Sequence, residues 1–207
     1  MKKPFAALAA ALLLTGCAAP SQETASPEPA SAPAARMERM SSSMVESSAR
    51  PLLEEDILEA YERARRVYGW FDLEPLPASD ETAELDGTAY YRVSAEGVDD
   101  LEDLRTYLRG VFSQELADRL LDGHTARIQY RNIRGLLYVS GAARDRDPGK
   151  GESRVETEKL SEDLYSVNVM VDLLGEDGET VVGLECWSFP YAFLEDRWVF
   201  TDFRLVD

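Results

Sequence analysis

The sequence predicts an α+β domain in which two or three N-terminal helices pack on one curved antiparallel sheet of five or six strands. Two residue patterns along the chain support this fold class. In the segments 51–69, 99–110 and 113–123, apolar residues recur every three or four positions, which is the period of an amphipathic helix. From residue 126 onward the period is two, which is typical of strands with one buried face. The helices therefore precede most of the sheet.

The first 16 residues have the features of a lipoprotein signal peptide. Two lysines precede an apolar run from Phe5 to Leu14, about ten residues that suit a signal sequence but are too short to span a membrane. Small residues then lead to Cys17, whose thiol can carry a lipid. We expect cleavage after Gly16 and lipidation of Cys17. The protein is then extracytoplasmic and anchored to the outer face of a bacterial cell membrane.

Residues 17–49 are rich in Ala, Ser, Pro and Glu and contain no aromatic residue. This composition cannot bury enough apolar surface to offset the entropy lost on ordering the chain, so we expect a disordered tether. A tether of this length reaches about 30 Å on average and roughly 100 Å when extended. One folded domain is then expected over residues 50–207.

The first helix is expected after Pro51, which suits the first turn of a helix. Acidic residues occupy positions 54–56, at the positive end of the helix dipole. The apolar stripe consists of Leu53, Ile57, Ala60, Tyr61, Ala64, Val67 and Tyr68. Gly69 is a candidate C-terminal cap, and two prolines in the segment 70–77 keep that segment out of a helix.

Two shorter helices are expected next. Aspartates within residues 99–103 place negative charge on the first turn of the second helix, which ends near Gly110. Ser113 is a good N-cap for the third helix, and Gly123 ends it. The inward apolar positions are Leu101, Leu104, Tyr107 and Leu108 in the second helix, and Leu116, Leu120 and Leu121 in the third.

Segments of alternating character, separated by turn residues, indicate the strands. A short strand is expected over residues 88–93, before the second helix. Beyond Gly123, six candidate strands cover residues 126–133, 136–140, 153–159, 164–174, 180–193 and 198–206. Turn sequences occur at Asp86-Gly87, Arg134-Gly135, Glu176-Asp177-Gly178 and Glu195-Asp196. Because the connections are of hairpin length, we expect an antiparallel sheet.

The chain has two cysteines, and a lipidated Cys17 leaves Cys186 without an intramolecular partner. Cys186 lies in the apolar run 181–189, so we expect it to be a small buried hydrophobic residue. The net charge is −17. The negative electrostatic field of such a chain repels nucleic acid and anionic lipid and favours a basic protein as partner. We therefore expect no nucleic-acid partner and membrane contact through the lipid alone.

No pattern in the sequence indicates a catalytic or metal site. The single histidine, His124, has no nucleophile motif near it in the sequence. One His and one remaining Cys cannot form a His/Cys zinc site. The segment 145–152 resembles a calcium loop only superficially, because Lys150 occupies the glycine position and Pro148 interrupts the pattern. We expect neither metal nor cofactor, and no enzymatic activity.

The segment 141–151 differs from the other connections, because it is long, polar and carries both charge signs. Long loops on sheet scaffolds are either functional or mobile, and they can present side chains to a partner. A flexible hairpin tip without a role is the alternative interpretation.

Several segments together resemble a known family. They are Tyr68-Gly69-Trp70-Phe71-Asp72-Leu73-Glu74-Pro75-Leu76-Pro77, Tyr90-Tyr91-Arg92-Val93, Leu104-Arg105-Thr106-Tyr107-Leu108, Val111-Phe112-Ser113, Asn132-Ile133-Arg134-Gly135-Leu136-Leu137-Tyr138, Ala143-Arg144-Asp145 and Trp198-Val199-Phe200-Thr201-Asp202-Phe203. In this order they resemble the bacterial DL-endopeptidase inhibitors of the IseA type. The resemblance covers nearly the whole expected domain.

This resemblance implies a non-enzymatic inhibitor of cell-wall hydrolases that cut D-γ-glutamyl bonds in peptidoglycan. Such an inhibitor presents a loop to the active-site cleft of the hydrolase. Under this hypothesis the partner is a DL-endopeptidase. Arg144, Asp145 and Asp147 of the long loop are then the expected partner-binding residues.

Two other hypotheses remain open. Helices on a bent antiparallel sheet can enclose a ligand pocket, as in nuclear-transport-factor-2-like cone folds, which the ending 198–206 also resembles. An interior cavity lined by polar side chains would favour that small-ligand module. An enzyme using His124 and a carboxylate is the third hypothesis, and it requires His124 to point into a pocket.

Overall fold

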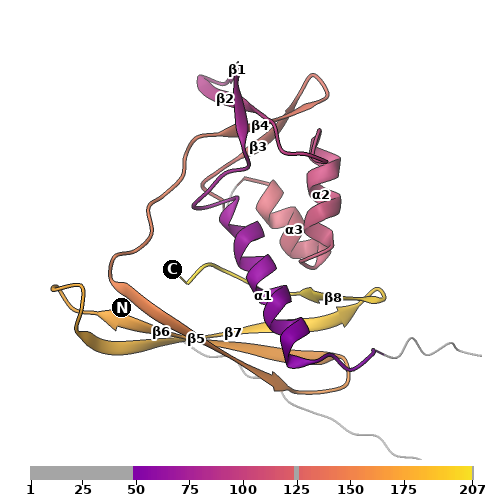
Figure 1. Cartoon of the computed structure of the whole chain (residues 1–207). Coiled ribbons are helices and arrows are strands. Elements are labelled where there is room, and N and C mark those ends of the chain that lie inside the picture. Colours follow the sequence, from indigo (N-terminus) through magenta and orange to yellow (C-terminus); the bar gives the residue numbers. More distant parts are fainter. Residues whose placement is uncertain (1–48, 124–125, 207) are drawn as a thin grey trace, which may run out of the picture. The chain divides into compact units, whose positions relative to one another are not determined.

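The computed structural model describes residues 49–123 and 126–206. These residues form three helices and two antiparallel four-stranded sheets, so the predicted α+β class is confirmed (Figure 1). The expected signal peptide, Cys17, His124 and all of the tether except its last residue lie outside the described residues. Within the described ranges, no helix combines the length and the apolar character needed to cross a membrane.

Helix α1 (Glu54–Gly69) forms where its apolar stripe predicts it. The fully buried side chains on this face are Ile57, Tyr61, Ala64 and Val67. Asp56 caps the N-terminus, because its Oδ2 accepts a hydrogen bond from the backbone N–H of Leu53 at 3.1 Å. At the other end, the carbonyl of Gly69 accepts from the N–H groups of Leu73 and Glu74, both at 2.9 Å. This tight turn leads the chain out of the helix.

Helices α2 (Leu101–Arg109) and α3 (Gln114–Leu121) also form where the sequence predicts them, although Tyr107, expected to point inward, is 44% exposed. Asp100 caps α2 by accepting from the N–H groups of Glu102 at 2.8 Å and Asp103 at 2.9 Å. Ser113 caps α3, since its Oγ accepts from the N–H of Leu116 at 3.3 Å. Each cap satisfies backbone donors that a helix start leaves without a partner within the helix.

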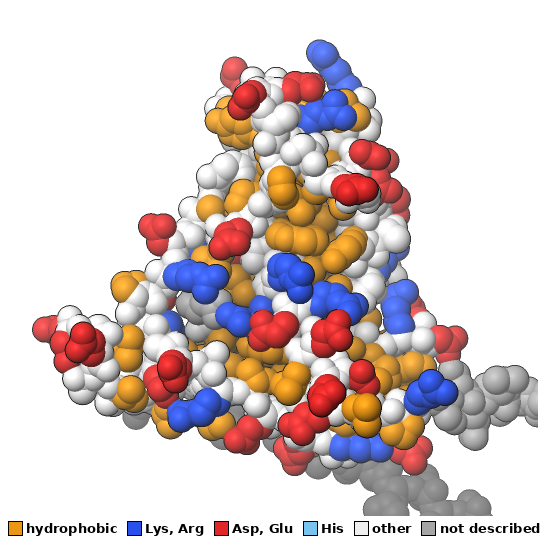
Figure 2. Space-filling model, in the orientation of Figure 1, with side chains coloured by type: hydrophobic (Ala, Val, Ile, Leu, Met, Phe, Trp, Pro, Cys, Tyr) orange, Lys and Arg blue, Asp and Glu red, His pale blue; other side chains and the backbone are white. Residues whose placement is uncertain are grey.

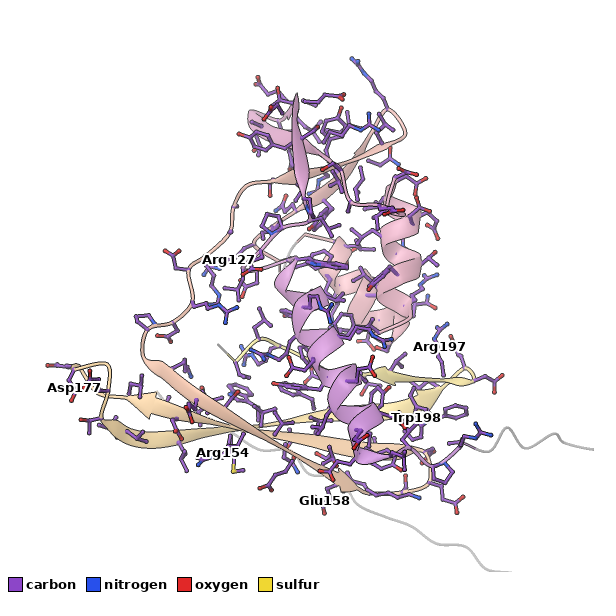
Figure 3. All side chains as sticks on the ribbon, viewed as in Figure 1. Arg127, Arg154, Glu158, Asp177, Arg197 and Trp198 are labelled. Carbon is purple, nitrogen blue, oxygen red and sulfur yellow. The ribbon has the colours of Figure 1, made fainter. Side chains whose placement is uncertain are left out.

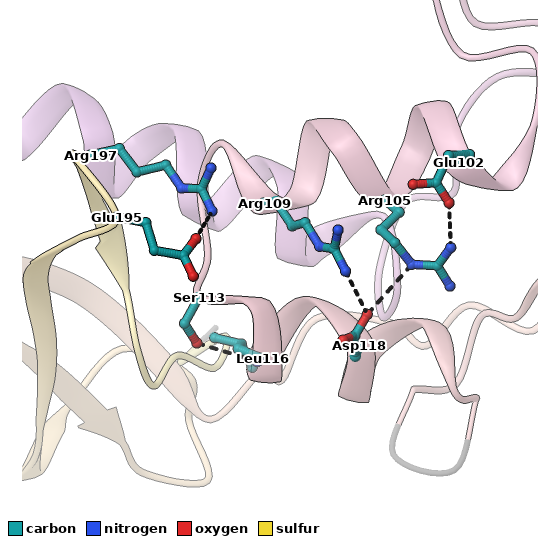
Figure 4. A network of polar contacts seen from close by, with 8 residues as sticks. All are labelled: Glu102, Arg105, Arg109, Ser113, Leu116, Asp118, Glu195 and Arg197. Carbon is teal, nitrogen blue, oxygen red and sulfur yellow. Dashed lines mark hydrogen bonds and ion pairs between the residues drawn. The ribbon is translucent and has the colours of Figure 1, made fainter.

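Ion pairs connect α2 to α3 (Figure 4). The Oδ1 atom of Asp118 lies 3.4 Å from Nε of Arg105 and 3.8 Å from Nη2 of Arg109. Arg105 also contacts Glu102 one turn earlier, at 2.6 Å. These side chains are partly exposed, so each pair contributes about 1 kcal/mol or less to stability.

The small sheet has the strand order β1-β2-β4-β3. Its strands are β1 (Ala78–Leu85), β2 (Thr88–Val93), β3 (Tyr130–Ile133) and β4 (Leu136–Ser140). The sequence did not predict β1, because this edge strand is almost entirely exposed and polar and so has no apolar alternation. It pairs with β2 through the turn at Asp86 and Gly87, which both have positive φ angles, 54° and 76°.

The large sheet is a meander with the order β5-β6-β7-β8. Its strands are β5 (Lys150–Lys159), β6 (Leu164–Leu174), β7 (Val181–Leu194) and β8 (Arg197–Phe200). Glu195 and Asp196 form the last turn with positive φ angles of 50° and 63°. Strand β8 is shorter than expected, because the chain leaves the sheet after Phe200 and brings Phe203 into the core.

The expected single sheet of five or six strands therefore differs from the structure, which has two sheets of four. The physical reason lies in residues 141–149 between β4 and β5, which form no hairpin. They carry the chain from the small sheet to the large one (Figure 1). As a result β5 pairs with β6 alone, and β4 pairs with β2 and β3.

One apolar cluster joins the three helices to both sheets. Phe203 lies in it, with ring centroids 4.7 Å from Phe189, 5.2 Å from Phe200 and 5.8 Å from both Tyr61 and Phe112. Among the described residues, the buried side chains other than hydrophobic ones are Ser140 and Ser166. The interior is therefore almost wholly apolar.

The expected burial of Cys186 is wrong, since this residue is exposed. On β7 it pairs with Met170, while its neighbour Trp187 pairs with the fully buried Val169. Side chains alternate between the two faces of a strand, so Cys186 lies on the face turned away from the core. An apolar run on this inner strand was not enough to indicate burial, because one face of the sheet is turned away from the core.

Candidate functional site

The segment 141–149, here called the strap, is the long loop that the sequence singled out. It has no helix or strand of its own and links the small sheet to the large sheet (Figure 1). The last two residues of the expected loop, 150 and 151, belong to β5. All strap residues are exposed except Arg144 and Gly149, which are half-buried. The strap is thus a crossing between sheets and not a hairpin tip.

Arg144 fixes the middle of the strap to Asp72. Its Nε donates to Oδ2 of Asp72 at 2.7 Å, and its backbone N–H donates to the Asp72 carbonyl at 3.0 Å. The two side chains are only 23% and 19% exposed. A half-buried pair with two hydrogen bonds holds its geometry better than an exposed one. The structure therefore places this expected partner-binding residue against the body of the protein.

A second arginine reaches the same carboxylate from another part of the chain. Nε of Arg127 lies 3.5 Å from Oδ1 of Asp72, and its side chain is 63% exposed. Arg144 occupies the other oxygen. Asp72 is therefore placed between two guanidinium groups, which join the segment after α1, the segment before β3 and the strap.

The far end of the strap is fixed by a turn around Pro148. Oδ1 of Asp147 accepts from the N–H of Gly149 at 2.9 Å, and the Asp147 carbonyl accepts from the N–H of Lys150 at 3.1 Å. The Gly149 carbonyl in turn accepts from the N–H of Leu174 at 2.9 Å. Asp147 thus has a local structural role, while its neighbours Asp145 and Arg146 stay exposed.

Two hollows lie beside the strap, and both are bordered by Leu205. The larger has a volume of about 500 Å³, with Trp70, Leu73 and Pro75 among its walls. The smaller measures about 270 Å³ and includes Tyr68 and the Asp72 cluster. We call the two hollows together the arginine groove, because their lining contains Arg65, Arg66, Arg127, Arg144, Arg146 and Arg204.

The charges of this face can be seen in Figure 2, where Lys and Arg side chains gather in a band between the two sheets. Within the groove, burial raises the pKa of the Tyr68 hydroxyl, and the charge of Asp72 raises it further. Arg204 acts in the opposite direction on the pKa of Tyr68. The Arg204 guanidinium lies over the ring of Trp187, 4.4 Å from its centroid.

Sequence reasoning missed Asp72, Arg127 and Arg204 as members of this site. They come from three distant segments without any common spacing, so no motif could have joined them. In the described ranges, no three Asp, Glu, Cys or His side chains converge to hold a metal ion. The chain matches no family model and no curated protein in comparisons with known proteins.

Proposed function

We propose that this protein is a non-enzymatic inhibitor of a peptidoglycan DL-endopeptidase, and that the strap is the element presented to the enzyme. The observation that supports this most directly is that the strap is exposed yet fixed at two points. Arg144 holds its middle on Asp72, and the turn at Asp147 holds its end. The residues between these points are exposed.

Fixing a loop before binding favours affinity, because less conformational entropy is lost when the complex forms. A flexible hairpin tip would lose that advantage. In this proposal, Asp145 and Asp147 face the partner and Arg144 positions the strap. The two carboxylates suit a basic rim around the partner's cleft, where complementary charge speeds association and selects the partner.

Inhibition requires no nucleophile, metal or cofactor, so it does not require His124. It does require that the protein lies at the cell wall. We propose that lipid on Cys17 provides it, with residues 17–49 as the tether. Growth with a labelled fatty acid, followed by immunoprecipitation, tests this part. The label is expected on the wild-type chain and absent from Cys17→Ala, and equal labelling of both would contradict it.

A direct assay tests the inhibitor. The purified full-length protein in detergent is added to a DL-endopeptidase and its wall substrate, and release of cleaved peptide is followed. We expect inhibition that saturates near one inhibitor per enzyme. Unchanged cleavage at a large molar excess over the wall DL-endopeptidases of the source bacterium would refute the proposal.

A matched pair of variants tests the strap. Asp145→Asn with Asp147→Asn is expected to weaken inhibition by about tenfold, because two carboxylates are removed from the contact. Glu158→Gln with Glu176→Gln removes the same charge from exposed positions on the large sheet and its turn. This control is expected to inhibit like the wild type. Equal loss in both variants would assign the effect to net charge and not to the strap.

The small-ligand module receives less support. It would require polar side chains around an interior cavity, but in the described part of the chain only Ser140 and Ser166 are buried polar residues. The two hollows beside the strap are open to solvent. The third hypothesis depends on His124, which lies outside the described residues.

A further inference from the structure

The arginine groove collects positive charge on a strongly acidic chain. Six arginines line its two hollows, and the carboxylates among the lining residues are Glu62, Asp72 and Glu74. The lining thus carries a net charge of +3, whereas the whole chain carries −17. Bringing like charges together costs free energy unless an opposite charge is supplied. The groove therefore favours an anionic occupant.

Inside the smaller hollow, one carboxylate lies among three arginines. Asp72 is shared between Arg127 and Arg144, so one negative charge faces two positive ones. Arg204 adds a third, and its stacking on Trp187 holds the guanidinium in place without neutralising it. An additional carboxylate is the group that would balance this cluster, because guanidinium groups bind carboxylates with paired hydrogen bonds.

The larger hollow adds apolar walls and further arginines. Its volume of about 500 Å³ falls within the usual range of ligand sites, roughly 300–1,000 Å³. Trp70 and Leu73 offer apolar surface, and Arg66 lies on the same lining. Arg65 and Arg146, also on this lining, are paired with Glu62 at 3.3 Å and with Glu74 at 4.0 Å. A ligand with carboxylates and aliphatic stems fits these features better than an isolated ion. Leu205 borders both hollows, so they lie next to each other.

We infer that the arginine groove binds a short acidic peptide. One carboxylate meets Arg127 and Arg204, a second meets Arg66, and the aliphatic parts lie on Trp70. A long polyanion is disfavoured, because beyond about 10 Å from the groove it meets the negative field of the remaining surface. This inference does not rest on the inhibitor proposal.

Calorimetry with the full-length protein tests the inference. Tetraglutamate is titrated at about 20 mM salt, with tetraglutamine as the uncharged control and inorganic phosphate as a competitor. We expect heat of binding for tetraglutamate and none for tetraglutamine. The affinity for tetraglutamate is expected to fall by about tenfold or more at 0.5 M salt. Equal binding of tetraglutamine, or full displacement by equimolar phosphate, would overturn the assignment to an acidic peptide.

Variants locate the binding in the groove. Arg127→Gln and Arg204→Gln change exposed side chains and are each expected to weaken tetraglutamate binding by about three- to tenfold. Arg154→Gln is the matched control, because Arg154 is an exposed arginine paired with Asp172 on the large sheet, away from Arg127 (Figure 3). Thermal unfolding verifies that each variant is folded. Equal loss from Arg154→Gln, or no loss from both groove variants, would overturn the site.

The strap variant separates this inference from the proposed function. Asp145→Asn with Asp147→Asn is expected to keep tetraglutamate binding, because neither residue lines either of the two hollows. Loss of inhibition with binding retained would leave the groove assignment intact. Binding lost together with inhibition would show that the strap and the groove are one site, and would overturn their independence.

Discussion

Arg144 and Asp72 are joined by two hydrogen bonds, one from the guanidinium to the carboxylate at 2.7 Å and one between the backbones at 3.0 Å. The two residues are 72 positions apart in the chain. One residue of the strap is therefore held through both its side chain and its main chain. The pair connects the crossing between the sheets to the segment that follows α1.

Replacing Arg144 tests the strength of this connection. Arg144→Gln is expected to lower the free energy of unfolding by about 1–2 kcal/mol, because a half-buried carboxylate loses a charged donor. Urea denaturation measures the change, and hydrogen exchange is expected to speed up along the strap. In a double-mutant cycle with Asp72→Asn, the coupling energy is expected to be about 1 kcal/mol. Arg63→Gln serves as a surface control, because its partner Glu59 is 78% exposed, and its change is expected to stay within about 0.5 kcal/mol. A coupling energy of zero would contradict the pairing.

Tyr130 supports the neighbouring segment through its hydroxyl group. The hydroxyl donates to the Trp70 carbonyl at 3.0 Å and accepts from the Leu76 N–H at 3.0 Å. Burial raises the pKa of this hydroxyl far above its ordinary value, so it stays protonated across the working range of pH. Tyr130→Phe leaves two backbone groups without that partner and is expected to cost about 1–3 kcal/mol of stability.

Chemical denaturation measures the effect of Tyr130→Phe against Tyr91→Phe, which removes a hydroxyl from a side chain that is 41% exposed. The control is expected to change stability by less than about 0.5 kcal/mol. If both variants were equally stable, the hydroxyl of Tyr130 would not be holding the segment 70–77 in place.

Local sequence patterns predicted the helices well and the sheet less well. The stripe of α1 and the caps at Asp100 and Ser113 depend on neighbours within four positions, so the sequence contains the whole signal. Strand pairing depends on residues far apart. Nothing in the alternation of β4 and β5 shows that the strap separates them into different sheets, and the exposed β1 has no alternation to detect.

The candidate site was predictable only as a segment. Length and mixed charge pointed to residues 141–151, but they could not show that Arg144 turns inward. Its direction depends on Asp72, and the groove depends also on Arg127 and Arg204, which the fold alone brings together. Cys186 shows the same limit, because the apolar run around it does not reveal which face of β7 is open.

Phe203 is expected to be the most sensitive core position in the C-terminal segment. Its ring is 3% exposed and contacts aromatic rings from α1, β7, β8 and the segment between α2 and α3. Phe203→Ala is expected to destabilise the fold by about 3–5 kcal/mol, since it leaves a cavity among these rings. Leu194→Ala, at a side chain 43% exposed, is the control and is expected to cost about 1 kcal/mol or less. A similar loss for both would contradict the central role of Phe203.

The stability of the turn between β6 and β7 is expected to depend on pH because of Asp177 (Figure 3). Its carboxylate accepts from the hydroxyl of Thr180 at 2.5 Å and from the N–H groups of Thr180 at 2.9 Å and Glu179 at 3.1 Å. These hydrogen bonds, the one from the Thr180 hydroxyl first, lower the pKa of Asp177 from 3.8 to about 2. Because the pKa is lower in the folded state, the stabilisation is present above pH 3.8 and is lost as the pH falls towards 2.

An NMR titration of the Asp177 side chain measures this pKa. Thr180→Val removes the hydroxyl donor, so the pKa of Asp177 is expected to rise towards its ordinary value. Thr82→Val, at an exposed position on β1, is the matched control and is expected to leave the pKa unchanged. An ordinary pKa in the wild type, or an equal rise in both variants, would mean that the Thr180 hydroxyl does not bond to the carboxylate in solution.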